Sequence, residues 1–183
     1  QFLGTAATAQ VVGEAFGMSL PHSALSPSGE PIWLDMARRS ALALMRLTAN
    51  STPLSDILTP AALENAMLVH AAFGGSTNLL IHLVAMARAG GIILDWQDFS
   101  DISEVTPLLA RVYPNGLADV NHFHAAGGLG YMIHELLGAG LLHPDTRTVA
   151  GGGLELYTQE PKLRNGELVW EPGTTKSLNE KIV

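Results

Sequence analysis

Residues 71–91 read AAFGGSTNLLIHLVAMARAGG. Two adjacent glycines and the small polar residues Ser76, Thr77 and Asn78 precede a long apolar run that ends in two more glycines. A serine in front of an apolar, helically periodic run is typical of a helix N-terminus, and glycine after such a run is typical of its end. The stretch therefore predicts a glycine turn that leads into a helix whose N-terminus lies at Ser76 or Thr77.

This predicted helix start lacks negative charge. A capping box would place Glu or Gln three residues after the cap, where Leu79 stands, and no Asp or Glu occurs from Asn65 to Leu94. Unpaired N–H groups and the helix dipole favour an anion at such a start, and glycines let a ligand approach the backbone. We therefore expect the turn to accept a carboxylate or phosphate through free amides. The alternative is a buried helix start whose serine and glycines serve tight packing.

Composition excludes several classes of function. The 183 residues are 47% hydrophobic, enough for one sizeable core. Ten basic against seventeen acidic residues give a net charge of -7, which does not suit nucleic acid. No signal-peptide pattern and no apolar run of roughly 18 residues occurs, so we expect a cytoplasmic protein without a membrane partner. The absence of cysteine excludes disulfides and cysteine metal ligands.

The hydrophobic pattern predicts an α/β fold that is rich in helices. Thr59 is the expected N-cap of a helix whose first residue is Pro60. An acidic turn is expected at 95–101. Helices are expected at 5–16, 32–47, 60–72, 76–89, 104–112 and 130–137, and short strands at 92–94, 154–157 and 168–170.

The histidines give weaker signals. His122 and His124 alternate like metal ligands on a strand, but no third ligand follows at a recognisable spacing, so no metal site is expected on this chain. His70 and His82 flank the glycine turn and could reach a ligand, although a histidine on an apolar helix more often has a hydrogen bond in the core. No Ser/His/Asp arrangement stands out, so no catalytic residue is assigned.

Three blocks carry a resemblance to a known family: GTAATAQVVGEAFGMSLPHSA at 4–24, GGSTNLLIHLVAMARAGG at 74–91 and YPNGLADVNHFHAAGG at 113–128. The chain resembles an internal part of the family that contains dihydroxy-acid dehydratase, phosphogluconate dehydratase and the xylonate-type sugar-acid dehydratases. The likeness covers essentially all residues. Up to about residue 83 the chain is more similar to the xylonate-type branch, and from Val84 onward to 6-phosphogluconate dehydratase.

The resemblance implies an activity for the parent protein. Such enzymes are hydro-lyases that convert a 2,3-dihydroxy acid into a 2-keto-3-deoxy acid with an iron–sulfur cluster and Mg²⁺, and 6-phosphogluconate is the first-choice substrate. A xylonate-type aldonate is the alternative within the class, and a non-catalytic α-rich fragment or binding module is the alternative outside it. A homo-oligomer is also expected. The chain alone is expected to be inactive.

The resemblance also implies where this chain would lie in such an enzyme. Residues 1–183 resemble a single partial domain, the middle portion of a larger dehydratase within its large N-terminal α/β domain, and 148–183 resemble an irregular extension toward the next domain. Relatives carry a cysteine cluster ligand just before the residue that matches Gln1. The residues implied to be adjacent to the cluster are Gln1, Thr5 and Thr8, and those implied to contact substrate are Ser76, Thr77 and Asn78. Ala7 stands where many relatives have asparagine.

Overall fold

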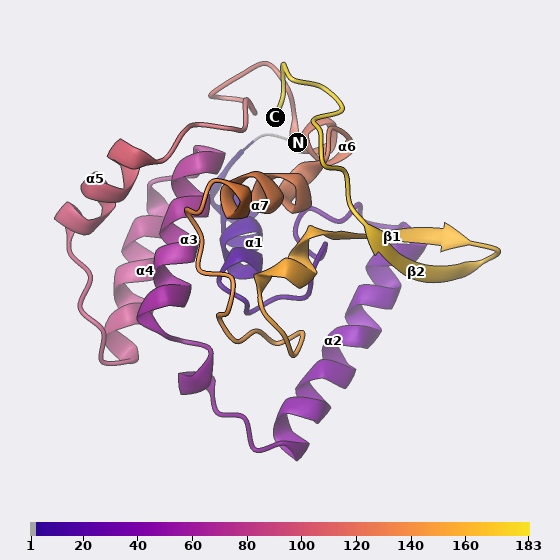
Figure 1. The fold of residues 1–183 in the computed structure, drawn as a ribbon, viewed down its shortest axis with the longest axis horizontal. Coiled ribbons are helices and arrows are strands. Elements are labelled where there is room, and N and C mark those ends of the chain that lie inside the picture. The colour runs from indigo at the N-terminus through magenta and orange to yellow at the C-terminus, as the bar shows by residue number, and fades with distance from the viewer. Residues whose placement is uncertain (1–2) are drawn as a thin grey trace.

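A computed structural model describes residues 3–183 (Figure 1). Within this range the chain folds into seven α-helices, two 3₁₀ helices and one two-stranded sheet. The α-helices are α1 (Thr5–Ala15), α2 (Pro31–Ala49), α3 (Pro60–Phe73), α4 (Asn78–Ala89), α5 (Trp96–Val105), α6 (Val120–Ala125) and α7 (Gly128–Gly138). The 3₁₀ helices are η1 (Leu54–Asp56) and η2 (Leu154–Thr158), and the strands are β1 (Gln159–Arg164) and β2 (Glu167–Pro172). No helix of the described part is long and apolar enough to cross a membrane.

Helix α3 is the centre of the fold, because ten of its fourteen residues are buried. It begins as expected, with Pro60 in its first turn and the Thr59 hydroxyl accepting a hydrogen bond from the Ala62 N–H at 3.2 Å. It ends at Gly74, whose φ of 66° is a left-handed conformation that glycine adopts without steric cost. Helices α1, α5 and α7 all pack against α3.

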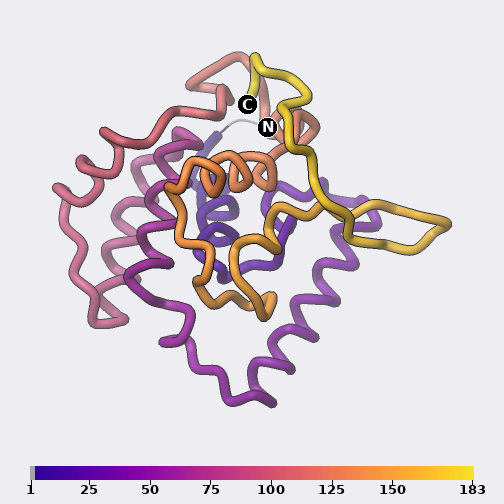
Figure 2. The backbone as a smooth tube through the Cα atoms, in the orientation of Figure 1, coloured from indigo at the N-terminus to yellow at the C-terminus, as the bar shows by residue number. Residues whose placement is uncertain are grey.

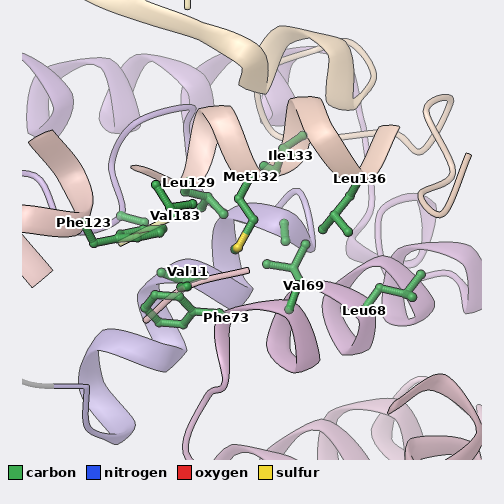
Figure 3. Packing of buried hydrophobic residues seen from close by; sticks show 14 of the residues in the cluster. Val11, Leu68, Val69, Phe73, Phe123, Leu129, Met132, Ile133, Leu136 and Val183 are labelled. Atoms are coloured by element: carbon green, nitrogen blue, oxygen red, sulfur yellow. The ribbon is translucent and has the colours of Figure 1, made fainter. Parts of the chain in front are cut away.

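Two apolar clusters hold these helices together, and α1 belongs to both. On one side of α1, Val11 packs with residues of α3, α6 and α7 (Figure 3). On the other side, Val12 packs with α3 and α4. The first cluster includes Val69, Phe73, Phe123, Met132, Ile133 and Leu136, and the second includes Phe16, Leu63, Met67, Leu79 and Leu83. Burial on both faces therefore fixes α1 against the N-terminal end of α4.

The sheet is a hairpin that projects from the body of the molecule near the start of α2 (Figure 1). Its strands pair antiparallel from Gln159 opposite Pro172 to Arg164 opposite Glu167. Asn165 and Gly166 both have positive φ, which is typical of the tight turn that matches strand twist. The strand expected at 168–170 is thus confirmed within β2, while β1 was not foreseen.

The C-terminal segment lies beside the loop that follows α5 (Figure 2). The Arg111 N–H donates to the Ile182 carbonyl at 2.8 Å, and Val183 is part of the first cluster. The Leu3 N–H donates to the Tyr113 carbonyl at 2.8 Å. This loop therefore joins both ends of the described chain.

The helices expected at 5–16, 32–47, 60–72 and 130–137 are confirmed, with ends that differ by a few residues. Helix α6 was missed, because six residues are too few for a clear helical period. It forms because the Asp119 side chain accepts hydrogen bonds from the Asn121 and His122 N–H groups.

The expected strand at 92–94 is wrong. These residues form an irregular link between α4 and α5, and Ile92 and Leu94 pack partly buried against the second cluster. A strand needs a neighbour to pair its backbone groups, and the described chain places none beside this link. Short apolar runs alone do not distinguish a strand from a buried link.

The expected acidic turn at 95–101 is wrong as well, because this segment starts α5. The Asp95 carboxylate accepts from the N–H groups of Gln97 at 2.8 Å and Asp98 at 3.2 Å, and the Asp98 carboxylate accepts from the Asp95 N–H at 2.8 Å. This reciprocal capping box nucleates the helix. Acidic residues thus mark a helix start here.

The expected helix at 104–112 is wrong beyond Val105, where α5 ends. Pro107 lacks an N–H and disfavours helical geometry at Thr106, which has an extended conformation. The strand expected at 154–157 is also wrong, because these residues form the 3₁₀ helix η2. There, Leu154 and Tyr157 are both buried three positions apart, a spacing that places them on one side of such a helix.

Candidate substrate-binding site

The N-terminal ends of α1 and α4 meet, and their polar side chains form one hydrogen-bonded cluster. The Thr5 hydroxyl lies 3.2 Å from the Ser76 hydroxyl. The Asn78 side-chain amide donates to the Thr5 hydroxyl at 3.0 Å and to the Ser76 hydroxyl at 3.2 Å. Thr8, one turn further along α1, accepts from the Ser76 N–H at 3.0 Å. The structure thus places Thr5 and Thr8, which are expected near an iron–sulfur cluster, within hydrogen-bond distance of residues expected near substrate.

Helix α4 starts at the second of the two expected positions. Its N-cap is Thr77, its first helical residue is Asn78, and the Thr77 side chain makes no capping bond. Of the two expected starts, Thr77 is therefore confirmed as the N-cap, and the Ser76 hydroxyl accepts a long bond of 3.4 Å from the Asn78 N–H. The backbone of Ser76 bonds to α1 through its N–H and to α3 through its carbonyl oxygen, which also accepts from the Leu79 N–H of α4 at 3.0 Å.

The expectation of free amides at 74–78 is only partly met. The Gly74 N–H donates to Ala71 and the Gly75 N–H to His70, while the Ser76 N–H is held by Thr8. Within residues 3–183 the Thr77 N–H has no hydrogen-bond acceptor. Thr77 and Asn78 are exposed and Ser76 is half-buried. Among the described residues, the Thr77 hydroxyl and N–H and one hydroxyl proton of the Thr5–Ser76 pair therefore remain as donors toward solvent, whereas the Asn78 amide donates within the cluster. Neither α1 nor α4 has an acidic residue in its first turn.

The two glycines serve packing, as the alternative interpretation held. A Cβ atom on Gly75 would lie 2.6 Å from Thr8 Cγ2 and 2.7 Å from His70 Cδ2. A Cβ on Gly74 would lie 2.2 Å from the side-chain nitrogen of Asn115, which donates to the Gly74 carbonyl at 2.7 Å. Asn115 belongs to the YPNG motif, but nothing in that motif indicates its partner. Packing does not compete with binding, because the side chains beyond the turn still face solvent.

Two cavities flank the turn. One of about 520 Å³ lies between α3, α4 and α5 and includes His70, Gly74 and Gly75 in its lining. The other, of about 850 Å³, is largely apolar and lies between α1 and α4, with Thr5 and His82 in its lining. Thr5 of the polar cluster thus lines one cavity, and the two turn glycines line the other.

His70 and His82 have different environments. His70 is 8% exposed, its Nε2 lies 3.0 Å from the Ser76 carbonyl oxygen, and burial lowers its pKa. A carbonyl oxygen only accepts, so Nε2 carries the proton. His82 is exposed on α4 and lines the apolar cavity. Of the two, only His70 is bonded to the turn.

His122 and His124, the pair with metal-ligand spacing, do not point to a common site. His122 and His124 lie on helix α6 rather than on a strand. The Nδ1 of His122 is 3.0 Å from an Asp119 carboxylate oxygen, whereas the His124 ring faces His22 at 6.0 Å between centroids. Burial lowers the pKa of His124, as it does for His22.

The donor set of this chain does not fit an iron–sulfur cluster or a magnesium ion. The sequence has no cysteine, and among residues 3–183 no three His, Asp or Glu side chains are grouped so as to hold a metal. Gln1 lies outside the described residues. The arrangement can bind an anion or a hydroxylated molecule through neutral donors.

Residues 1–157 match the family described as dihydroxy-acid/6-phosphogluconate dehydratase, N-terminal. The chain belongs to this family of dehydratases. It is 48% identical over its whole length to the phosphogluconate dehydratase of Escherichia coli (strain K12) and 46% to that of Pseudomonas aeruginosa. It is 50% identical over 85% of its length to a D-xylonate dehydratase of Escherichia coli (strain K12). The chain spans 31%, 30% and 24% of the lengths of these relatives, respectively.

Proposed function

We propose that the protein containing this chain is a hydro-lyase that dehydrates a sugar acid to a 2-keto-3-deoxy acid, with 6-phosphogluconate as first-choice substrate. The similarity to phosphogluconate dehydratases over the whole chain supports this proposal. The reaction expels a hydroxide and removes a weakly acidic proton, and it needs electrophiles at both centres. The iron–sulfur cluster and Mg²⁺ that the family resemblance implies would supply this electrophilic chemistry, with ligands from outside this chain.

The role proposed for this chain is to hold the acid group of the substrate. The observation that carries it is the convergence of Thr5, Ser76 and Asn78 at the meeting helix ends, beside the Thr77 N–H, which has no acceptor among residues 3–183. The Thr77 N–H and the remaining hydroxyl proton of the Thr5–Ser76 pair are neutral donors at the positive ends of helix dipoles, where an anion is stabilised, and the Asn78 amide holds the two hydroxyls in place. Homo-oligomer formation remains part of the proposal.

A second candidate substrate is an unphosphorylated aldonate such as D-xylonate. The observation that favours it is the 50% identity to a D-xylonate dehydratase, over 85% of this chain. Measuring kcat/KM of the full-length protein with 6-phosphogluconate and with D-xylonate distinguishes the two candidate substrates, because the true substrate should have the higher value. If the full-length protein converts neither acid, the alternative that the chain belongs to a non-catalytic binding protein is favoured.

Ser76→Asp in the full-length protein tests the anion site. Aspartate would place a negative charge beside Thr5 and Asn78, where the acid group of the substrate belongs. We expect KM to rise by a factor that corresponds to about 1 to 3 kcal/mol of lost binding. The matched control is Ser28→Asp, in an exposed turn before α2. Equal kinetic constants for Ser76→Asp and the wild type would show that the anion does not bind here.

A further inference from the structure

Ser76 is held at both of its main-chain groups by buried side chains from two different helices. Its N–H donates to the Thr8 hydroxyl of α1 at 3.0 Å, and its carbonyl oxygen lies 3.0 Å from Nε2 of His70 on α3. Thr8 is fully buried and His70 is 8% exposed. Such bonds are hard for water to replace, because both partners are shielded from solvent.

The direction of each bond follows from the atoms. The Thr8 hydroxyl gives its only proton to the Gly4 carbonyl at 2.9 Å, so its oxygen is free to accept from Ser76. The His70 backbone carbonyl also accepts from the Gly75 N–H at 3.0 Å. His70 therefore holds the turn twice, through its main chain and through its ring.

Close packing also restricts the turn. Gly75 lies between Thr8 and His70, with no room for a Cβ atom against either side chain. The peptide groups on both sides of Ser76 thus cannot rotate without breaking a buried bond or moving a helix. What this arrangement leaves outside is the Ser76 hydroxyl, which points to Thr5 and Asn78, and the N–H of Thr77.

We propose that His70 and Thr8 are positioning residues that fix the Ser76 hydroxyl and the Thr77 N–H in the orientation that binds the carboxylate of the sugar acid. This inference rests on the proposed function, because it assigns a task to a site whose ligand is part of that proposal. Neither side chain contacts the substrate. Both act through the backbone of Ser76, as supporting residues do in precise binding sites.

The test uses the full-length protein and the sugar acid that the wild type turns over fastest. His70→Phe keeps a ring but removes the donor, and Thr8→Val keeps the shape but removes the hydroxyl. We expect each to raise KM about tenfold, with kcat within about threefold of wild type, since the loss is of binding orientation. His70→Gln and Thr8→Ser restore a donor or a hydroxyl and should bring KM back to within about threefold of wild type.

His134→Gln at a half-buried position of α7, away from the turn, is the matched control and should leave both constants unchanged. A residue with only a structural role would lower kcat in proportion to the folded fraction and leave KM alone, and that result would overturn the proposal. If His70→Phe does not fold, Thr8→Val decides the test by the same criterion.

A second readout needs no turnover. Hydrogen exchange of the Ser76 amide in the substrate-free protein should be slow in the wild type and in Thr8→Ser, and about tenfold faster in Thr8→Val. Fast exchange in the wild type would show that the backbone of Ser76 is not held. Absence of dehydratase activity in the wild type would instead refute the proposed function and, with it, the assigned task, whereas the exchange rates would still report on the hold itself.

Discussion

The hydroxyl oxygen of Thr8 lies 3.0 Å from the backbone nitrogen of Ser76 and accepts its hydrogen bond. This bond ties the first helix of the chain to the turn between α3 and α4. Gly75 fits between Thr8 and His70 only because it has no side chain. The turn at the candidate site is therefore specified by close packing as much as by hydrogen bonding.

Gly75→Ala is expected to destabilise the fold by about 1 to 3 kcal/mol, because the added methyl group overlaps Thr8 and His70. The free energy of unfolding in urea measures this loss. In the full-length protein the same change should raise KM for the sugar acid, since Ser76 would shift with the turn.

Gly138→Ala is the matched control, at the end of α7, where a Cβ atom meets nothing within 4 Å. Alanine in a helix is favoured over glycine by up to about 1 kcal/mol, so this change should leave stability equal or increase it. Equal stability of Gly75→Ala and wild type would mean that the turn has more room than the structure shows.

Glu14 on α1 is fully buried, and its two carboxylate oxygens accept from the N–H groups of His22 at 2.7 Å and Ala24 at 2.8 Å. Burial raises the pKa of Glu14 to about 8. The folded state therefore binds a proton that the unfolded state, with an ordinary carboxyl pKa of 4.5, has released between these two values. Stability must fall as pH rises through this window.

We expect the free energy of unfolding to decrease by about 1 kcal/mol between pH 7 and 8.5. Burial lowers the pKa of His22, His70 and His124. Their contribution to the free energy of unfolding is therefore lost as pH falls below the ordinary histidine pKa, and it is nearly constant above pH 7. Glu14→Gln should remove the decrease, whereas Glu155→Gln at an exposed position should keep it. Urea unfolding across this pH range measures the slope, and an unchanged slope in Glu14→Gln would assign it to another group.

Asn65 on α3 is buried and is hydrogen-bonded to the loop after α7. Its side chain donates to the His143 carbonyl at 3.0 Å and accepts from the His143 N–H at 2.8 Å. Asn65→Ala should cost about 1 to 3 kcal/mol of unfolding free energy, because both hydrogen bonds from the buried Asn65 amide to the backbone of His143 are lost.

The neighbouring residue Glu64 provides the comparison for Asn65. Its carboxylate lies 2.8 Å from Nε2 of His143, but both side chains are exposed. Glu64→Gln should change stability by less than about 1 kcal/mol, because solvent screens such pairs. Chemical denaturation of both variants tests the contrast, and a larger loss for Glu64→Gln would reverse it.

The 183-residue chain should retain no iron–sulfur cluster after anaerobic reconstitution with iron and sulfide. Clusters are held by cysteine thiolates, and the sequence contains none. Iron and sulfide analysis after desalting measures the retained cluster. About one cluster per chain would contradict the prediction and require ligands of another kind.

The sequence by itself determined the local features. Proline and threonine at 59–60 and glycine at 74 mark the two ends of α3, because φ restriction and capping act within one turn. The GGSTN stretch identified the turn into α4 and its lack of acidic residues. The family blocks suggested Thr5 and Thr8 as adjacent to an iron–sulfur cluster and Ser76, Thr77 and Asn78 as close to substrate, but they did not indicate the hydrogen bonds between the two groups.

Tertiary structure alone decided the rest. It left 92–94 unpaired, because a strand depends on which neighbours are available. It selected Thr77 over Ser76 as the cap of α4 and brought Thr5 to Ser76, because α1 is buried on two faces and has one position that satisfies both clusters. No local pattern encodes the bond from Ser76 to Thr8, since it joins residues that only long-range packing brings together.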